Sequence, residues 1–314
     1  MYCIISGSDD PFFNIAVEEI LLRKSTEEFL ILAINRTSVI VGKHQSTHRE
    51  INTRFVSDNK IPVVRRISGG GTVFHDPGNL NFTFIRNSEA GSQIDFPKFT
   101  GPVIDFLASA GIKARLEGKS DIKVNGLKIS GNAGHVHRNR VLHHGTVLFS
   151  ASIETLGSCL RKDTSCYTTT AVKSNPSPVT TLREMMPGFK DITGFRSGMM
   201  DFFMEIFPGS EIYNLSEDER SEATALAGSK YNSWDWIYAY GPEYEFRTGF
   251  LFKGRDVTVR LYAKGGIIWD CLIQGSEFLS GIDKKLIGCR HMPEDVKEVL
   301  RKEKREDLDV YELF

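Results

Sequence analysis

Residues 65–76 (RRISGGGTVFHD) gather groups that suit the binding of an anion. Arg65 and Arg66 offer fixed positive charge, and the glycines from Gly69 to Gly71 can present backbone N–H groups and approach a phosphate closely. The run has neither the Walker A spacing nor the G-x-G-x-x-G spacing, so the standard phosphate loops are not indicated. The alternative is a flexible hairpin loop with solvated arginines, and residue types alone leave both interpretations open.

A lysine in residues 121–133 (DIKVNGLKISGNA) is the second candidate for chemistry. Alternation along a strand places Lys128 on the same face as Ser130 and on the opposite face from Leu127 and Ile129. If the face of Lys128 lines a cleft, its ammonium group can neutralise an acyl carboxylate or an α-phosphate. If that face meets solvent, Lys128 is an ordinary surface lysine, and alternation cannot decide between the two.

Histidines form the third group, at His143 and His144, with His135, His137 and His75 earlier in the chain. Adjacent positions on a strand point to opposite faces, and no Cys or Glu completes a familiar zinc ligand set. We therefore predict hydrogen-bonding or structural roles for these histidines and no metal site.

The elements that position these residues follow from periodicity and from start and stop signals. Asp10 and Pro11 begin a helix, Ser216 caps another, and Asn125-Gly126 predicts a type I′ hairpin turn. The predicted helices are 12–24, 102–110, 198–206, 217–226 and 293–301, and the predicted strands are 29–35, 38–41, 61–67, 72–75, 79–85, 121–124, 127–130, 141–150, 246–253, 257–263 and 267–273. Strands, hairpins and helices are mixed without strict βαβ alternation, which indicates an α+β fold.

Composition bounds the class of protein. The chain has 314 residues, of which 40% are hydrophobic and 25% charged, so it reads as globular, with two domains expected at about 150 residues each. A net charge of −1 gives no whole-molecule attraction to nucleic acid or to an anionic membrane. The longest apolar run, 29–34, is too short to span a bilayer, and the first residues do not form a signal peptide.

Five scattered cysteines, an odd number without C-x-x-C spacing, fit neither a disulfide framework nor a zinc knuckle. We expect a soluble, cytoplasmic protein.

Residues 161–181 are polar and proline-marked, which is typical of a functional or disordered loop. The aromatic stretch from Trp234 to Tyr240 favours core packing over a platform for stacking bases. We place a domain boundary near residue 245.

Together these segments resemble the lipoate–protein ligase A branch of the biotin/lipoate protein ligase family. The resemblance rests on several short motifs in the family's order: residues 10–19 (DPFFNIAVEE), 65–76, 78–79 (GN), 128–133 (KISGNA) and 143–146 (HHGT). It continues more loosely through residues 234–242 and beyond. The implied fold is a large mixed-sheet catalytic domain, residues 1–245, followed by a small α+β accessory domain, residues 246–314.

The resemblance also implies which residues act. Lys128 matches the family lysine that touches both lipoate and the acyl-adenylate, and we take it as the catalytic residue. The positions implied for ATP or adenylate binding are Arg66, Gly71, Thr72, Val73, Phe74 and Lys128, and those implied for lipoate are Arg66, Ser68, Gly70, Gly71, His75, Lys128 and His144. Residues Ala171 to Val179 resemble a mobile adenylate-binding loop, which would close over the intermediate and protect it from water.

The implied activity is an ATP-dependent ligase that forms lipoyl-AMP and transfers the lipoyl group to a lysine of an acceptor domain. ATP and Mg²⁺ are the implied cofactors, and the implied partners are E2 subunits of 2-oxoacid dehydrogenase complexes and the glycine cleavage H protein, acted on by a monomer. The alternative is an ATP-independent transferase that moves octanoyl or lipoyl groups between carrier proteins. Some such relatives use a cysteine nucleophile, and they typically lack the small C-terminal domain.

Overall fold

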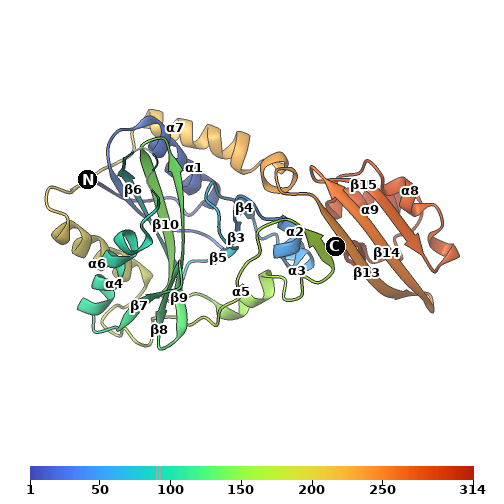
Figure 1. Cartoon of the computed structure of the whole chain (residues 1–314), viewed down its shortest axis with the longest axis horizontal. Coiled ribbons are helices and arrows are strands. Elements are labelled where there is room, and N and C mark those ends of the chain that lie inside the picture. Colours follow the sequence, from blue (N-terminus) through green and yellow to red (C-terminus); the bar gives the residue numbers. More distant parts are fainter. Residues whose placement is uncertain (90, 92) are drawn as a thin grey trace. The chain divides into compact units, whose positions relative to one another are not determined.

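The computed structural model describes residues 1–89, 91 and 93–314 (Figure 1). The chain packs into two compact units, each assembled from segments that are distant in sequence. The larger unit comprises Met1–Lys43, Val63–Leu156 and Asn175–Asn232, and the smaller comprises His44–Pro62, Gly157–Ser174 and Ser233–Phe314. Among the described residues, no helix combines the length and the apolar character that crossing a bilayer would require.

An eight-stranded sheet forms the centre of the larger unit, in the order β12-β1-β2-β6-β10-β9-β8-β7. Strand β1 pairs in parallel with β12 and β2, and the remaining pairs are antiparallel, so the sheet is mixed. The strands are β1 (Tyr2–Ile5), β2 (Phe29–Ile34), β6 (Asn79–Asn87), β7 (Ala114–Glu117), β8 (Asp121–Val124), β9 (Leu127–His137), β10 (Arg140–Leu148) and β12 (Glu211–Ile212). The predicted α+β class with a large mixed sheet is confirmed.

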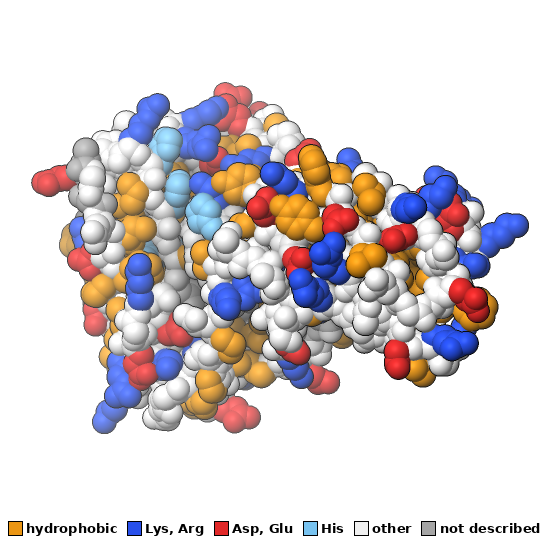
Figure 2. Space-filling view, turned by 45° about the vertical axis from the view of Figure 1, so that its right-hand side comes forward, with side chains coloured by type: hydrophobic (Ala, Val, Ile, Leu, Met, Phe, Trp, Pro, Cys, Tyr) orange, Lys and Arg blue, Asp and Glu red, His pale blue; other side chains and the backbone are white. Residues whose placement is uncertain are grey.

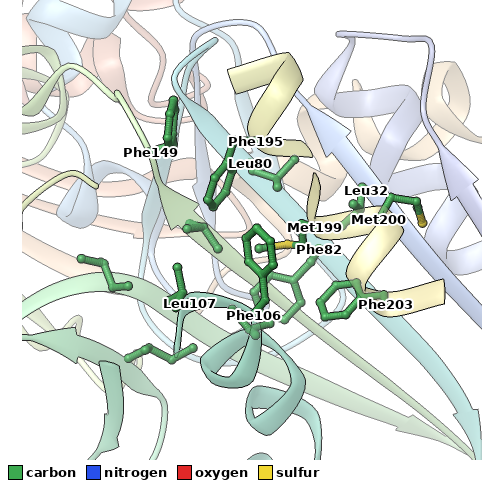
Figure 3. Close-up of a cluster of buried hydrophobic side chains, with 14 of the residues drawn as sticks. Leu32, Leu80, Phe82, Phe106, Leu107, Phe149, Phe195, Met199, Met200 and Phe203 are labelled. Atoms are coloured by element: carbon green, nitrogen blue, oxygen red, sulfur yellow. The ribbon is translucent and has the colours of Figure 1, made fainter. Parts of the chain in front are cut away.

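One face of this sheet is covered by α4 (Phe96–Ser109) and α6 (Ile192–Ile206). Their apolar side chains meet Leu32 of β2 and Phe82 of β6 in a dry cluster (Figure 3). Both helices start earlier than expected, because Asp95 and Asp191 accept hydrogen bonds from the backbone of the first turn. Helix α4 continues through Pro102.

The other face carries α1 (Pro11–Lys24), capped by Asp10, whose side chain accepts from the Phe12 N–H. Strand alternation separates the two faces residue by residue. Phe82 belongs to the apolar cluster, whereas its neighbour Thr83 is hydrogen-bonded to Glu18 of α1. Helix α7 (Glu217–Leu226), whose bounds match the prediction, begins at a capping box formed by Ser216 and Glu219. Helix α5 (Ile153–Cys159) and the π-helical turn η1 (Ala227–Tyr231) are the remaining helical segments that enter this unit.

A second, three-stranded sheet, β4-β3-β5, holds the glycine motif. Its strands are β3 (Ser38–Val41), β4 (Val63–Arg65) and β5 (Val73–His75), with β3 parallel to β4 and antiparallel to β5. Residues 66–72 therefore connect two strands that flank the same central strand, and the loop between them has fixed ends. Strand β4 is shorter than the predicted 61–67.

The predicted hairpin at Asn125-Gly126 is confirmed. Both residues have positive φ angles, 52° and 79°, as a type I′ turn requires, and they join β8 to β9. This turn fixes the register that brings Lys128 to its place at the start of β9.

The smaller unit contains a four-stranded sheet in the order β11-β13-β14-β15. Its elements are α2 (Thr47–Glu50), α3 (Thr53–Asp58), β11 (Tyr167–Thr169), η2 (Asp235–Ala239), β13 (Tyr244–Phe252), β14 (Arg255–Lys264), β15 (Ile267–Gln274), η3 (Glu277–Leu279), α8 (Ile282–Leu286), α9 (Pro293–Lys302) and η4 (Val310–Leu313). Helices α8 and α9 and the last residues pack against the sheet in a second apolar cluster.

The aromatic stretch lies in the smaller unit. The Trp234 ring packs against Gly266 and lies 4.4 Å from the Arg290 guanidinium carbon, and Trp236 contacts Tyr240 at 4.4 Å between ring centroids. These contacts are those of a packed joint between helix and sheet. Residue 245, the predicted domain boundary, falls inside β13. The division into domains 1–245 and 246–314 stays a prediction.

Candidate active site

The buried side chain of Arg66 holds the backbone of the glycine loop through hydrogen bonds. Its side chain is buried, with Nη2 donating to the carbonyl oxygens of Gly69 and Gly71 at 2.6 Å each and Nη1 donating to that of Ile40 at 3.0 Å. In a trans peptide the N–H points opposite to the C=O, so the N–H groups of Gly70 and Thr72 point away from the guanidinium. Arg66 thus fixes the direction of the Gly70 and Thr72 N–H groups. Burial lowers the pKa of Arg66 to about 10, and it stays charged near neutral pH.

The loop rests on strand β9. Gly70 has φ +86°, and a Cβ there would lie 3.1 Å from Arg66 Nη2 and 3.8 Å from the Ala133 Cβ. A residue with a side chain would be strained in this conformation and would displace the guanidinium. Glycine at position 70 therefore allows the close approach of loop, arginine and strand.

Lys128, near the start of β9, also lies beside the glycine motif. A Cβ at Gly131 would lie 3.1 Å from Lys128 Nζ and 3.7 Å from Val73 Cγ1, so the lysine side chain runs along Gly131 beside the glycine motif. Its Nζ lies 2.9 Å from Asp121 Oδ1, and its side chain is about one-fifth exposed, at 21%. Alternation left open whether this face lines a cleft or meets solvent; the structure holds Lys128 beside the glycine motif with about one-fifth of its side chain exposed, and its catalytic role stays a prediction.

Ser68, His144 and Glu18 form a hydrogen-bonded row beside Arg66. Arg66 Nε donates to Ser68 Oγ at 3.0 Å, Ser68 Oγ lies 2.6 Å from His144 Nε2, and His144 Nδ1 lies 2.9 Å from Glu18 Oε2. Glu18 Oε1 accepts from the Thr83 hydroxyl at 2.6 Å. Three predicted lipoate-binding residues are thus brought together, and α1 supplies the carboxylate that ends the row.

His75 lies at the end of β5 in the same neighbourhood. Its Nδ1 accepts from Asn35 Nδ2 at 2.9 Å, and the Asn35 oxygen accepts from Asn14 at 2.6 Å. Burial, with the nearby His144 and Arg66, lowers the pKa of His75 to about 3, so the ring is neutral. A neutral ring whose Nδ1 is already an acceptor keeps its Nε2 proton as a donor.

The other predicted nucleotide-binding residues follow in sequence along the motif. Gly71, Thr72 and Val73 are half-buried, and Phe74 is buried. Asp76 closes the motif, because its carboxylate accepts from the N–H groups of Gly78 and Ser152 at 2.9 and 2.7 Å.

His143 shows why adjacent histidines have separate roles. It points to the opposite face from His144, stacks on Phe99 at 4.9 Å between centroids and bonds Asn132 through Nε2 at 3.2 Å. Burial lowers its pKa to about 3. Histidine side chains are also visible on one surface of the larger unit in Figure 2, yet the described residues contain no group of three or more His, Cys, Asp or Glu side chains that could hold a metal ion.

The predicted adenylate-binding loop is anchored at its two ends. In the smaller unit, the Val172 N–H donates to the His44 carbonyl at 3.0 Å, and Ser174 bonds Glu50. In the larger unit, the Lys128 N–H donates to the Pro178 carbonyl at 2.8 Å and the Thr180 N–H donates to the Lys128 carbonyl at 3.0 Å. The end of the loop is therefore paired with the backbone of the candidate catalytic lysine.

The model of the lipoyl protein ligase A/B catalytic domain matches residues 10–203, which include every residue of this site. The chain belongs to the lipoate–protein ligase family. This confirms the family that the motifs indicated. The chain is 34% identical to lipoate–protein ligase 1 of Staphylococcus aureus, over 97% of this chain and 93% of the relative. It is also 34% identical to lipoate–protein ligase LplJ of Bacillus subtilis, over 93% and 91% of the two chains.

Solved structures show the same fold at lower identity. P. falciparum LipL1, solved with lipoate, superposes with a TM-score of 0.65 at 23% identity, covering 96% of this ligase-family chain and 94% of that one. A lipoate–protein ligase A solved with ATP superposes with a TM-score of 0.63 at 22% identity, covering 75% and 97%.

Sequence reasoning assigned no role to Glu18, Asn35 or Asp121, which the structure of this lipoate–protein ligase family member places against predicted site residues. A signal for Glu18 was present: two carboxylates, Glu18 and Glu19, interrupt a helix whose neighbouring positions are apolar. Carboxylates are rarely buried without a partner, so an acidic pair inside an apolar stretch indicates buried cations nearby.

Proposed function

We propose that the site around Lys128 and the glycine motif activates lipoate with ATP and passes the lipoyl group to a lysine of an acceptor protein. The protein is an ATP-dependent lipoate–protein ligase. The observation that carries this proposal is the position of the Lys128 ammonium over Gly131 and beside Val73, next to the loop that Arg66 orients.

In the first half-reaction the lipoate carboxylate attacks the α-phosphate of ATP, giving lipoyl-AMP and pyrophosphate. Negative charge develops on the phosphate oxygens, and fixed donors that face this charge lower the barrier. Lys128 supplies a charge, and the Gly70 N–H, which points away from the guanidinium that holds the Gly69 carbonyl, supplies an oriented backbone donor. We assign Arg66, Gly71, Thr72, Val73, Phe74 and Lys128 to the adenylate and Arg66, Ser68, Gly70, Gly71, His75, Lys128 and His144 to lipoate.

In the second half-reaction the ε-amine of the acceptor lysine attacks the acyl carbon and AMP leaves. No covalent enzyme intermediate is needed. The five cysteines are unpaired thiols, and burial raises the pKa of Cys159 to about 11 and that of Cys271 to about 12, which disfavours a thiolate.

Mg²⁺ fits this site as a companion of ATP. It usually binds through phosphates and water with one or two carboxylates, and Asp121 beside Lys128 offers a carboxylate of that kind. When bound, the ion would neutralise charge on the phosphates of ATP.

The acceptors we propose are lipoyl domains, in E2 subunits of 2-oxoacid dehydrogenase complexes and in the H protein. A lipoate ligase of Thermoplasma acidophilum, with a TM-score of 0.64 to this fold, was analysed together with its E2 lipoyl domain. Unpaired thiols fit the reducing environment of the cytoplasm, where we place the reaction.

The test is incubation with ATP, Mg²⁺, lipoate and an apo lipoyl domain, followed by the intact mass of that domain. A mass gain that needs ATP supports the ligase. A gain without ATP from an acylated carrier protein would instead support the transferase, and no gain under either condition would overturn both.

A further inference from the structure

Glu18 is a buried carboxylate with both oxygens occupied. It lies in α1 with 9% of its surface exposed, Oε1 accepting from the Thr83 hydroxyl and Oε2 facing His144 Nδ1 at 2.9 Å. Removing a carboxylate from water is costly unless polar partners compensate it. None of the predicted site assignments includes Glu18, although it ends the hydrogen-bonded row of Arg66, Ser68 and His144.

The chemistry of the row fixes where its protons lie. An ionised carboxylate only accepts, so His144 Nδ1 carries hydrogen and donates to Glu18. In the neutral ring Nε2 then accepts from the Ser68 hydroxyl, 2.6 Å away, and the Ser68 oxygen in turn accepts from Arg66 Nε at 3.0 Å. One consistent set of donors and acceptors runs from Arg66 to Glu18.

The opposite tautomer would break this order. With hydrogen on His144 Nε2 instead of Nδ1, the ring and Arg66 Nε would both direct donors at the Ser68 oxygen, and the Glu18 oxygen would face an unprotonated Nδ1. Arg66 Nη2 holds the carbonyls of Gly69 and Gly71, so a shift of Arg66 would reach the loop. The charge of Glu18 also opposes the effect of burial on the pKa of Arg66.

The row resembles the Ser-His-acid order of hydrolases, but Ser68 is unsuited to attack. Its side chain is fully buried, and its oxygen already accepts a hydrogen bond from the Arg66 cation. Donation from the Arg66 cation withdraws electron density from this oxygen and makes it a poorer nucleophile. The row therefore orients groups and does not form an acyl-enzyme.

We propose that Glu18 is a positioning residue of the adenylation site: it fixes the Nδ1–H tautomer of His144 and, through Ser68, the orientation of Arg66 and of the glycine loop. This inference rests on the proposed function of the site. Glu18 acts through its hydrogen bond to His144, which in turn contacts Ser68. Its loss should lower kcat for lipoyl-AMP formation on the order of 10- to 100-fold, as for other residues that orient a functional histidine, with little change in KM for ATP.

The experiment compares Glu18→Ala and Glu18→Met with Glu19→Ala and Glu19→Met, because methionine has a similar length but no oxygen that could accept from His144 Nδ1. Glu19 is the next residue of α1 and is also buried, with 1% of its surface exposed, but it is bonded to Arg23, Lys230 and Tyr231 instead of to His144. Both pairs of variants should lose stability, because each removes a buried carboxylate. Only the Glu18 variants should lower kcat.

The ¹⁵N chemical shifts of the histidine rings, assigned with His144→Gln, report the tautomer directly. We expect the Nδ1–H form of His144 in the wild type and in the Glu19 variants, and its loss as the dominant form in both Glu18 variants. Glu18→Met keeps the length of the side chain and removes both carboxylate oxygens, so it keeps the test available if Glu18→Ala does not fold.

A folded Glu18 variant with wild-type kcat, or with an unchanged His144 tautomer, would overturn the inference. Failure of the proposed function is recognised separately, because the wild type would then release no pyrophosphate with lipoate and ATP. The measurement of the His144 tautomer needs no substrate, so it tests the role of Glu18 whether or not the wild type forms lipoyl-AMP.

Discussion

Lys128 Nζ lies 2.9 Å from Asp121 Oδ1, although the residue opposite Asp121 in the pairing of β8 with β9 is Gly131. Both side chains are about one-fifth exposed, at 21% and 23%. The carboxylate holds the ammonium group in one direction without removing it from water. A substrate phosphate or carboxylate can therefore take over part of this pairing without a large movement of the lysine.

Lys128→Ala should remove most adenylation activity and leave the fold intact. Loss of one preorganised charge typically costs about 100- to 1000-fold in rate. Pyrophosphate release measures the activity, and thermal unfolding measures the fold. Lys123→Ala is the matched control, because this lysine lies on neighbouring β8 and pairs with Glu117. Near wild-type release from Lys128→Ala would remove Lys128 from the catalytic role.

Gly70→Ala should damage both stability and adenylation. A side chain at φ +86° costs about 1–2 kcal/mol, and its Cβ would lie 3.1 Å from Arg66 Nη2. Urea unfolding and pyrophosphate release measure the two effects. Gly69→Ala is the control from the same loop, since a Cβ there meets no atom within 4 Å and its φ is not in the left-handed region. Equal behaviour of the two variants would contradict the tight packing of loop and arginine.

A variant without cysteines should still transfer lipoate from synthetic lipoyl-AMP to an apo lipoyl domain. Cys3, Cys159 and Cys271 are buried, so their replacement by alanine should lower stability. No thiolate takes part in the proposed reaction. Transfer is followed by intact mass at a temperature where circular dichroism shows the variant folded. Loss of transfer in the folded variant would favour a covalent transferase.

The segment from Ala171 to Val179 should become more protected from hydrogen exchange when an acyl-adenylate binds. Its polar residues bury little apolar surface when the site is empty, and a bound phosphate gives the closed state the affinity that ordering requires. A non-hydrolysable lipoyl-AMP analogue is the probe. The Thr180 amide, already bonded to the Lys128 carbonyl, is an internal reference expected to change little. Equal exchange with and without the analogue would show an ordinary surface loop.

Acid should destabilise the protein through its buried histidines. The folded-state pKa of His143 is lowered to about 3, whereas the ordinary value is near 6.5, so the unfolded chain binds the proton first. The contribution of His143 to the free energy of unfolding is therefore fully present above pH 6.5. It is lost as the pH drops toward 3, by up to about 1.4 kcal/mol per pH unit. Urea unfolding between pH 7 and 4 should show a smaller slope for His143→Gln.

Local signals predicted much of the framework. The bounds of α7 and its cap at Ser216 depend on neighbouring residues alone, and so does the turn at Asn125-Gly126. Alternation could assign Lys128 to one face of a strand but could not show what that face meets. The neighbours of the lysine are Gly131 and Val73 beside the glycine loop, which only the folded sheet brings together.

The partners of the site residues could not be predicted in the same way. Glu18, Ser68 and His144 are far apart in sequence, and each belongs to a different element. No local propensity encodes their hydrogen bonds. The segments that form the smaller unit could not be predicted either. They include residues 44–62 and 157–174, whose sequences contain no signal that they pack with the end of the chain.

The pairing of β11 with β13 joins Tyr167 to Phe246 and Thr169 to Tyr244. A gene divided after codon 245 would therefore cut through β13 and part most of that strand from β11, and a division before Ser233 would still leave residues 44–62 and 157–174 on the other product. The smaller unit is therefore not encoded by one continuous stretch of the gene. Grafting it between relatives would require three matched segments to be moved at once.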